Sequence, residues 1–259
     1  MKAKSIDKYI IVGTRLRYLQ DCKEGFPIHG DKFVIKNIEC FLNDLEELNL
    51  NVTRRASGNL EAFYKKLKRE KKDSKISKAQ AVEISSIMTN LRQTFFAESE
   101  GILAYVVDDK RYDTRKLIDD ISELFQPGIF YYLPSISKYD FEEAGKCIAF
   151  QRPTAAAFHL LRGIEANLKK YHKCFFRGNN DSKTWGTLIN ELRNKTRGKI
   201  PNLVTVNHLD NIRSSFRNPT QHPEKTYEIQ EVQDLLGLTI DVINRMINET
   251  KKYYTQHGQ

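Results

Sequence analysis

The stretch that decides the fold class runs from Ala155 to Tyr171, AAAFHLLRGIEANLKKY. Its apolar residues recur at spacings of three and four, which places them along one side of an α-helix. The residues on that side are Ala157, Phe158, Leu161, Ile164, Leu168 and Tyr171. Arg152-Pro153-Thr154 interrupts the chain just before this stripe, so we predict a long helix that begins after the break.

The same periodicity recurs towards the C-terminus. Its stripes are Trp185, Leu188, Ile189 and Leu192; then Leu209, Ile212 and Phe216; and then Val232, Leu235, Leu236, Thr239, Val242, Ile243 and Met246. Upstream, Asp140–Glu143 has the capping-box pattern that starts a helix. Four or five antiparallel helices joined by short connections predict an all-α, up-down helical bundle over residues 140–259.

A further helical region precedes this bundle. Apolar stripes follow Ile35 and Ile84, and Ser77 with Gln80 forms a capping box before the second stripe. A third stripe follows Asp113 and stops at Pro127-Gly128. The segment 131–139 has turn composition, so we predict a domain boundary at 139/140, with residues 1–139 forming an N-terminal helical region of unassigned role. The run 102–107 fits a short strand or a helix equally well.

Composition excludes several classes of protein. The apolar runs of this 259-residue chain are too short to span a bilayer, and no apolar core follows the basic N-terminus as in a signal peptide. We therefore expect a cytoplasmic protein with no membrane partner, whose four cysteines are reduced thiols. His172 and Cys174 lack the further ligands that zinc needs, and no glycine-rich phosphate loop is present. We expect neither a metal nor a cofactor.

The net charge of +9 is concentrated in one segment. Within residues 65–78, only Glu70 and Asp73 oppose eight cations, which are Lys65, Lys66, Lys68, Arg69, Lys71, Lys72, Lys75 and Lys78. Such a segment can supply sequence-independent affinity for RNA phosphates, for which Lys65, Lys66, Lys68 and Arg69 are the candidates. The alternative is a solvated helix end and loop that keeps the protein in solution.

The hexapeptide Arg217-Asn218-Pro219-Thr220-Gln221-His222 carries the strongest functional signal. Asn218 and His222 both precede prolines, which disfavours helical backbone there, so we predict that the helix ends near Arg217. A break at Pro219 would let the His222 side chain turn back towards Arg217. The plain alternative is a basic helix end followed by an Asn-Pro turn. Spacing alone does not decide, because Arg152 and His159 have similar spacing.

The context of this hexapeptide resembles the HEPN superfamily (higher eukaryotes and prokaryotes nucleotide-binding). Its signature is an arginine, usually followed by a polar residue, with a histidine four to six positions downstream of a helix; Arg217-Asn218 and His222 match it. Residues 155–165 look like an earlier helix of prokaryotic members, and Glu165 with Lys169 resembles a charged pair that some of them carry. The resemblance covers roughly residues 140–250. Many members are four- or five-helix bundles that act as ribonucleases in toxin, antiviral-defence or RNA-processing systems.

The resemblance implies a metal-independent endoribonuclease. In such cleavage the RNA 2′-hydroxyl attacks the adjacent phosphorus, so the site needs proton transfer and positive charge. Histidine suits the first task and the arginine fork suits the second. We therefore expect His222 to act as general acid or base, Arg217 to stabilise the transition state and Asn218 to orient one of them. Arg213 and Tyr227 are further candidates for RNA contact, through a phosphate and through base stacking.

One histidine does not easily serve both proton transfers. The resemblance implies a homodimer whose two motifs line one composite active site, with RNA as substrate and an antitoxin or a defence-system protein as a further partner. Two other functions fit the sequence. The first is a catalytically silent HEPN-like module that binds RNA, a nucleotide or a protein. The second is a purely structural helical protein.

Overall fold

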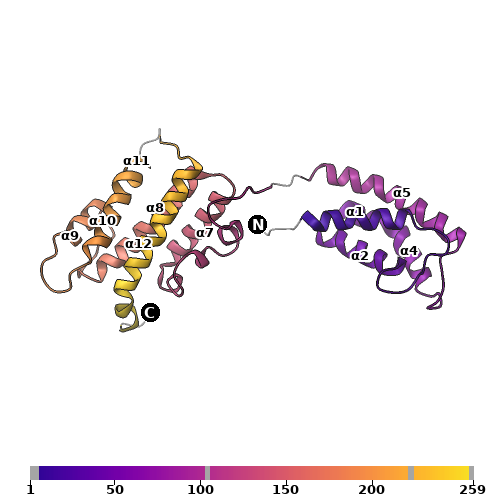
Figure 1. The fold of residues 1–259 in the computed structure, drawn as a ribbon, viewed down its shortest axis with the longest axis horizontal. Coiled ribbons are helices and arrows are strands. Elements are labelled where there is room, and N and C mark those ends of the chain that lie inside the picture. Colours follow the sequence, from indigo (N-terminus) through magenta and orange to yellow (C-terminus); the bar gives the residue numbers. More distant parts are fainter. Residues whose placement is uncertain (1–5, 103–105, 221–224, 257–259) are drawn as a thin grey trace. The chain divides into compact units, whose positions relative to one another are not determined.

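The structure, a computed structural model, describes residues 6–102, 106–220 and 225–256. Within these ranges the chain is all-α, with no β-strand and one isolated bridge between Pro27 and Lys75. The chain divides into two compact units, Met1–Tyr105 and Val106–Gln259, and each has its own hydrophobic core (Figure 1). None of the described helices combines the length and the apolar character that a membrane crossing requires.

The first unit packs short helices around one buried cluster. The helices described in it are α1 (Ile6–Gln20), α2 (Val34–Glu47), α3 (Asn51–Ala56), α4 (Gly58–Leu67) and α5 (Lys78–Glu100). The two predicted stripes are confirmed, since Ile38 and Leu45 of α2 and Ile84 and Met88 of α5 are fully buried. The predicted capping box is also present, because the Ser77 side chain accepts from the Gln80 amide and the Gln80 side chain accepts from the Ser77 amide.

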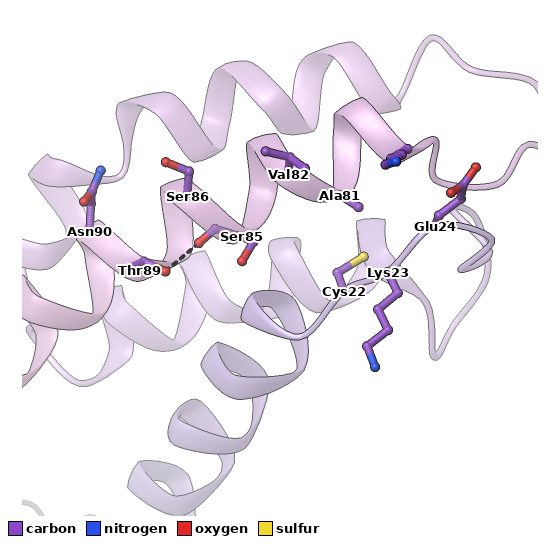
Figure 2. A pocket seen from close by; sticks show the side chains of 10 residues that line it. Cys22, Lys23, Glu24, Ala81, Val82, Ser85, Ser86, Thr89 and Asn90 are labelled. Carbon is purple, nitrogen blue, oxygen red and sulfur yellow. Dashed lines mark hydrogen bonds between the residues drawn. The ribbon is translucent and has the colours of Figure 1, made fainter.

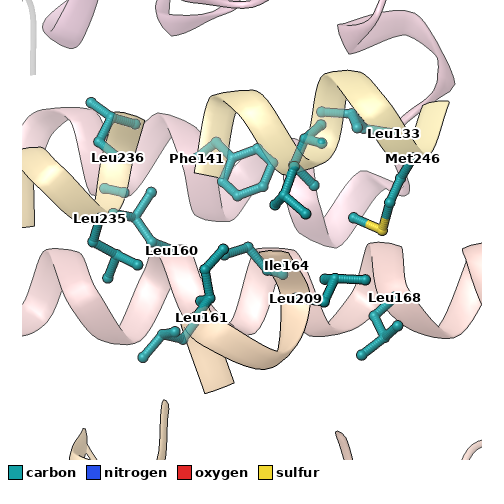
Figure 3. Close-up of a cluster of buried hydrophobic side chains, with 14 of the residues drawn as sticks. Leu133, Phe141, Leu160, Leu161, Ile164, Leu168, Leu209, Leu235, Leu236 and Met246 are labelled. Atoms are coloured by element: carbon teal, nitrogen blue, oxygen red, sulfur yellow. The ribbon is translucent and has the colours of Figure 1, made fainter. Parts of the chain in front are cut away.

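The second unit is a helical bundle centred on two long helices. Its elements are α6 (Thr114–Ile118), η1 (Ile121–Leu124), η2 (Phe130–Tyr132), α7 (Ser135–Ala149), α8 (Pro153–Lys173), α9 (Trp185–Arg193), α10 (Leu203–Ile212), η3 (Arg213–Arg217), α11 (Asn218–Thr220) and α12 (Ile229–Gln256). Helix α8 packs against both α7 and α12. Figure 3 shows the buried side chains where they meet, among them Phe141 of α7, Ile164 of α8 and Leu235 of α12. Fully burying a side chain of this size stabilises the fold by about 1.5–3 kcal/mol.

Close contact between α7 and α8 depends on a glycine. A Cβ atom at Gly163 would lie 2.5 Å from the Phe141 ring, so any larger residue would push the two helices apart. The Ser137 hydroxyl donates to the Gly163 carbonyl oxygen at 2.9 Å in the same buried region. The long helix predicted after Arg152 therefore exists, begins at Pro153, and has α7 along its length.

The domain boundary lies earlier than the sequence predicted. The predicted division was 139/140, whereas the structure divides the chain after Tyr105. The reason is that Leu117, Ile121 and Phe125 are buried in the core of the second unit, where Phe125 stacks on Phe141 with ring centroids 5.5 Å apart. Residues 106–139 therefore belong to the C-terminal bundle.

The start of α7 also differs from the prediction. The helix begins at Ser135, directly after Pro134, and not at the capping-box pattern of Asp140–Glu143. Asp140 consequently lies in the middle of the helix with its side chain fully buried. The capping pattern misled because tertiary burial, which local sequence does not reveal, supplies the partners of this carboxylate.

The helix that carries Phe216 does not end at Arg217. Helix α10 passes into the π-helical segment η3, in which the Asn218 amide donates to the Arg213 carbonyl oxygen five residues back, and α11 follows. Asn218 has helical backbone angles (φ −64°, ψ −50°) although it precedes Pro219. The prediction of a helix break at Pro219 is therefore wrong. The π segment accommodates the proline, which has no amide to donate within a regular helix.

A buried histidine joins α8 to α9 in the second unit. His172 is 2% exposed, its Nε2 atom lies 2.6 Å from Glu191 Oε2, and its ring stacks on Phe176. Burial lowers the pKa of His172, although its hydrogen bond to Glu191 acts in the opposite direction. The folded unit therefore favours the neutral imidazole.

We expect the stability of the second unit to depend on this histidine at mildly acid pH. Because the folded-state pKa of His172 is lowered, the unfolded chain binds the proton first. The contribution of His172 is complete above its unfolded pKa of about 6.5 and is lost as the pH falls below it. Trp185 is the single tryptophan of the sequence and is buried in this unit, so its fluorescence in urea reports the free energy of unfolding. A His172→Gln variant with the same pH dependence as the wild type between pH 5 and 7.5 would contradict this expectation.

Candidate functional site

Arg217 and Asn218 lie at the junction of η3 and α11. Arg217 is half-buried and Asn218 is exposed. Among the residues that the structure describes, no carboxylate pairs with the Arg217 guanidinium. π-helical turns occur frequently at functional sites, because the extra residue displaces side chains from regular helical positions. The backbone therefore presents Arg217 and Asn218 in a way that a regular helix would not.

Two hydroxyl groups fix this junction through hydrogen bonds to the Phe216 carbonyl oxygen. The hydroxyl oxygens of Thr220 and Tyr227 lie 2.6 and 2.9 Å from the Phe216 carbonyl oxygen and 2.6 Å from each other. The Phe216 and Tyr227 rings are stacked, with their planes 15° apart. The Tyr227 amide donates to Thr154 Oγ1 at 3.1 Å, which ties this segment to the start of α8.

Tyr227 supports the junction of η3 and α11 from inside the protein. It is 5% exposed, its hydroxyl is engaged inside the protein, and its ring contacts Phe216 and the Lys225 ammonium. Stacking of this ring on an RNA base would require it to leave its contact with Phe216, so that role stays a prediction. Tyr227 belongs to the core cluster of the second unit and lies shortly before α12.

We expect Tyr227→Phe to loosen the junction without removing a group that meets RNA. The loss of this hydroxyl should lower the free energy of unfolding by about 1 kcal/mol, measured by Trp185 fluorescence in urea. It should also slow any RNA cleavage, because Arg217 is held less firmly. Tyr171→Phe is the matched control, since it removes another internal hydroxyl, bonded to Glu249 at 2.7 Å in the same unit. Equal effects of both changes on cleavage would contradict a positioning role for Tyr227.

The candidate phosphate contact Arg213 is engaged by a carboxylate. Its Nε and Nη2 atoms lie 2.9 and 2.8 Å from Asp210 Oδ1, and Arg193 Nη2 lies 2.7 Å from Asp210 Oδ2. These hydrogen bonds, that of Arg193 first, lower the pKa of Asp210. A phosphate contact from Arg213 therefore has only its remaining Nη1 group to use, and stays a prediction.

The predicted acid–base residue, His222, lies outside the described residues, as do Gln221, Pro223 and Glu224. The chain is anchored on both sides of this segment. Thr220 is bonded to Phe216 before it, and Tyr227 is bonded to Thr154 after it. The described residues on either side of this segment are thereby held beside η3 and the start of α8.

The basic segment 65–78 lies at one end of the first unit, across the end of α4, the following loop and the first residue of α5. All eight cations are exposed. Lys66 pairs with Glu83 at 2.9 Å and the Lys68 ammonium lies 4.5 Å from the centre of the Tyr64 ring. The other six, including Lys65 and Arg69, have no carboxylate partner in the described part of the chain. The loop itself is fixed, because Ile76 is buried and its backbone bonds to that of the segment 25–26. Its amide donates to the Phe26 carbonyl oxygen, and its carbonyl oxygen accepts from the Gly25 amide.

An open hollow of about 540 Å³ begins beside this segment (Figure 2). One side of it is lined by α5, through the polar residues Ser85, Ser86, Thr89 and Asn90 and the apolar residues Ala81 and Val82. Cys22, Lys23, Glu24 and Lys78 complete the lining. Hydroxyl and amide groups beside lysines are the kinds of group that contact sugars and phosphates in nucleic-acid complexes. Because Glu24 and apolar side chains share this lining, the hollow does not decide between RNA contact and a solvated segment, and RNA contact by the basic segment stays a prediction.

A polar cluster between α7 and α8 was missed from the sequence. The buried Asp140 carboxylate receives hydrogen bonds from both His159 and Arg162. The sequence predicted Asp140 as a helix cap, and His159 was noted only for its spacing from Arg152. The sequence does contain an aspartate on one helix and a histidine and an arginine on the next. These residues predict a cluster only when it is known which faces of the two helices meet.

No group of three or more metal-ligating side chains gathers among the described residues. His172 bonds to Glu191 rather than joining Cys174. Glu165 and Lys169, the pair noted in the HEPN resemblance, lie 3.6 Å apart as an ion pair on α8. Compared with known proteins, the chain matches no family model, no curated protein and no solved structure.

Proposed function

We propose that this chain is a metal-independent endoribonuclease of HEPN type, with Arg217, Asn218 and His222 as its active site and an HEPN-like arrangement of the bundle. The observation that carries the proposal is the contrast among neighbouring arginines. Arg193 and Arg213 share the Asp210 carboxylate, whereas Arg217 has no carboxylate partner among the described residues. A guanidinium free of such a partner can bind two oxygens of a phosphate.

In the proposed reaction the RNA supplies its own nucleophile. The 2′-oxygen attacks the adjacent phosphorus as its proton passes to a base, the bond from phosphorus to the 5′-oxygen breaks, and that oxygen takes up a proton. His222 performs one proton transfer, and the same residue of the second subunit in a homodimer performs the other. Arg217 stabilises the charge that develops on phosphorus oxygens. The products are a 2′,3′-cyclic phosphate and a 5′-hydroxyl.

The biological role that fits is a growth-arresting toxin or an antiviral-defence effector controlled by a partner protein. The direct test is incubation of the purified chain with labelled single-stranded RNA, with and without EDTA. We expect equal cleavage in both, none of a DNA of the same sequence, and none by His222→Ala. If RNA is bound but stays whole, the chain is the alternative, a catalytically silent HEPN-like module that binds RNA, a nucleotide or a protein. A strict monomer in solution would contradict the composite active site.

We expect the basic segment to hold RNA through phosphate contacts. The double variant Lys71→Glu/Lys72→Glu should weaken binding of single-stranded RNA in fluorescence anisotropy. It should also reduce the slope of log K against log salt by about 0.7 for each lost contact. Lys173→Glu/Arg197→Glu, which makes the same change of charge on exposed sites of the second unit, is the control. Equal losses in both variants would show that net charge alone, and not this segment, sets the affinity.

A further inference from the structure

The Asp140 carboxylate is fully buried, yet both of its side-chain partners, His159 and Arg162, reach the surface. Its side chain is 0% exposed, and a buried charge is costly unless it is paired and hydrogen-bonded. Both of its oxygens are engaged. Arg162 donates Nε to Oδ2 at 2.8 Å and Nη2 to Oδ1 at 2.5 Å, and His159 Nδ1 lies 2.9 Å from Oδ1. The carboxylate therefore fixes the orientation of both partners.

The partners keep donors and acceptors on their exposed sides. A carboxylate that accepts from Nδ1 places the imidazole proton there, so Nε2 is left as the second functional atom of His159. The His159 side chain is 25% exposed and that of Arg162 is 57% exposed. Arg162 uses Nε and Nη2 on Asp140, which leaves Nη1 for a ligand, and its hydrogen bonds to Asp140 raise its pKa. An imidazole and a guanidinium thus stand together at the surface on a buried support.

Two exposed aromatic rings flank these groups. The Tyr139 ring meets His159 edge-on, with centroids 6.3 Å apart, and is 53% exposed. Phe158 is 52% exposed and lies four residues before Arg162, on the same face of α8. A carboxylate that only needed neutralising would not require rings beside it. Exposed aromatic rings next to cationic groups are what proteins use to stack unpaired bases and hold their phosphates.

We propose that Tyr139, Phe158, His159 and Arg162 form a contact site for one nucleotide of single-stranded RNA, distinct from the Arg217 site. Arg162 binds the phosphate through its free donors, Nε2 of His159 accepts a hydrogen bond from the nucleotide, and one of the two rings stacks on the base. The two sites differ in their residues: this one lies between α7 and α8, whereas Arg217 ends η3, which contacts α10 and α8. The choice of RNA rests on the proposed ribonuclease function. The site then holds the strand beyond the cleavage point and sets which bases are accepted there.

The test uses the full chain and a fluorescein-labelled hexamer of 2′-O-methyl RNA, which cannot be cleaved. Phe158→Ala and Tyr139→Ala remove exposed rings, so the fold should be retained, and the variant that loses the stacking ring should raise Kd about 5- to 100-fold. Phe96→Ala is the matched control, because Phe96 is also exposed (57%) and also has an arginine, Arg92, over its ring at 5.4 Å. It should change Kd less than twofold.

A second variant tests the contact made by His159 without disturbing the fold. His159→Asn keeps an amide where Nδ1 bonds Asp140 but removes Nε2, so it should weaken RNA binding while the melting temperature stays close to that of the wild type. As an independent measurement on the wild type, a nucleoside monophosphate should displace the hexamer at least tenfold better than inorganic phosphate. A hexamer without bases should bind the wild type and Phe158→Ala equally.

Unchanged Kd in both ring variants, or equal displacement by inorganic phosphate, overturns this proposal. The outcome is separate from that of the proposed function. Loss of binding in the ring variants with no RNA cleavage by the wild type would keep the nucleotide site and reject the nuclease. Normal RNA cleavage by the wild type, with unchanged RNA binding in both ring variants, would keep the nuclease and reject the nucleotide site.

Discussion

Arg217→Ala is expected to slow RNA cleavage by about 10²–10³-fold, which is the usual effect of removing one donor that stabilises transition-state charge. The guanidinium has no carboxylate partner in the described part of the chain, so its loss should leave the fold nearly unchanged. Arg217→Lys keeps the charge but loses the fork that binds two oxygens. Its cleavage rate should therefore lie between those of the wild type and Arg217→Ala. The measurement is the single-turnover rate on labelled RNA in EDTA.

Arg193→Ala is the matched control for this prediction. It removes a guanidinium that pairs with Asp210 at 2.7 Å and has no assigned role in RNA contact. It should cost some stability and change the cleavage rate less than tenfold. If Arg193→Ala slows cleavage as much as Arg217→Ala, general loss of positive charge or of structure explains both, and Arg217 has no special role.

Gly145→Ala is expected to lower the free energy of unfolding of the second unit by about 1–3 kcal/mol or more. A Cβ atom there would lie 2.3 Å from the Leu117 carbonyl oxygen and 2.9 Å from Ile121 Cδ1. A backbone carbonyl of α6 cannot yield as a flexible side chain does, so α6 and α7 must separate. Trp185 fluorescence in urea measures the loss in this unit alone.

Gly186→Ala supplies the control within the same bundle. The nearest atom to its added Cβ, Arg213 Nη1, is 3.8 Å away, so the change should be neutral or stabilise α9 by about 0.5–1 kcal/mol. If Gly145→Ala were as stable as Gly186→Ala, residues 106–139 would not pack on α7 in solution. The division of the chain after Tyr105 would then be wrong.

Much of the fold was predictable where apolar periodicity coincides with burial. The stripes of α2, α5, α8 and α12 and the capping box at Ser77 all follow from local sequence. Helix α1 was not predicted, because Ile10 and Ile11 are exposed and blur its stripe. The boundary at 139/140 failed for a different reason. Pro134 and its neighbours have the composition of a linker, yet Leu133 and Phe141 on either side of that segment are buried in one core.

The candidate site was only partly predictable. Arg217 and Asn218 are proposed from their motif, and the structure places them where η3 meets α11. There the helical backbone at Asn218 overrides the usual effect of the following proline. The hydrogen bond from the Tyr227 hydroxyl to the Phe216 carbonyl oxygen could not be predicted either, because it joins residues eleven positions apart that belong to different segments. Asp140, His159 and Arg162 were out of reach for the same reason. Their contacts join two helices, and no local pattern specifies which faces meet.

The proposed function predicts that this chain cleaves RNA through the 2′-hydroxyl at a site containing Arg217 and His222. Its most direct test is one RNA with a defined cleavage position, compared with the same RNA carrying a single 2′-deoxynucleotide on the 5′ side of the scissile phosphate. The wild type in EDTA should cut the first RNA to a 2′,3′-cyclic phosphate and a 5′-hydroxyl and leave that bond intact in the second. Cleavage of the 2′-deoxy bond at the same rate would contradict the account.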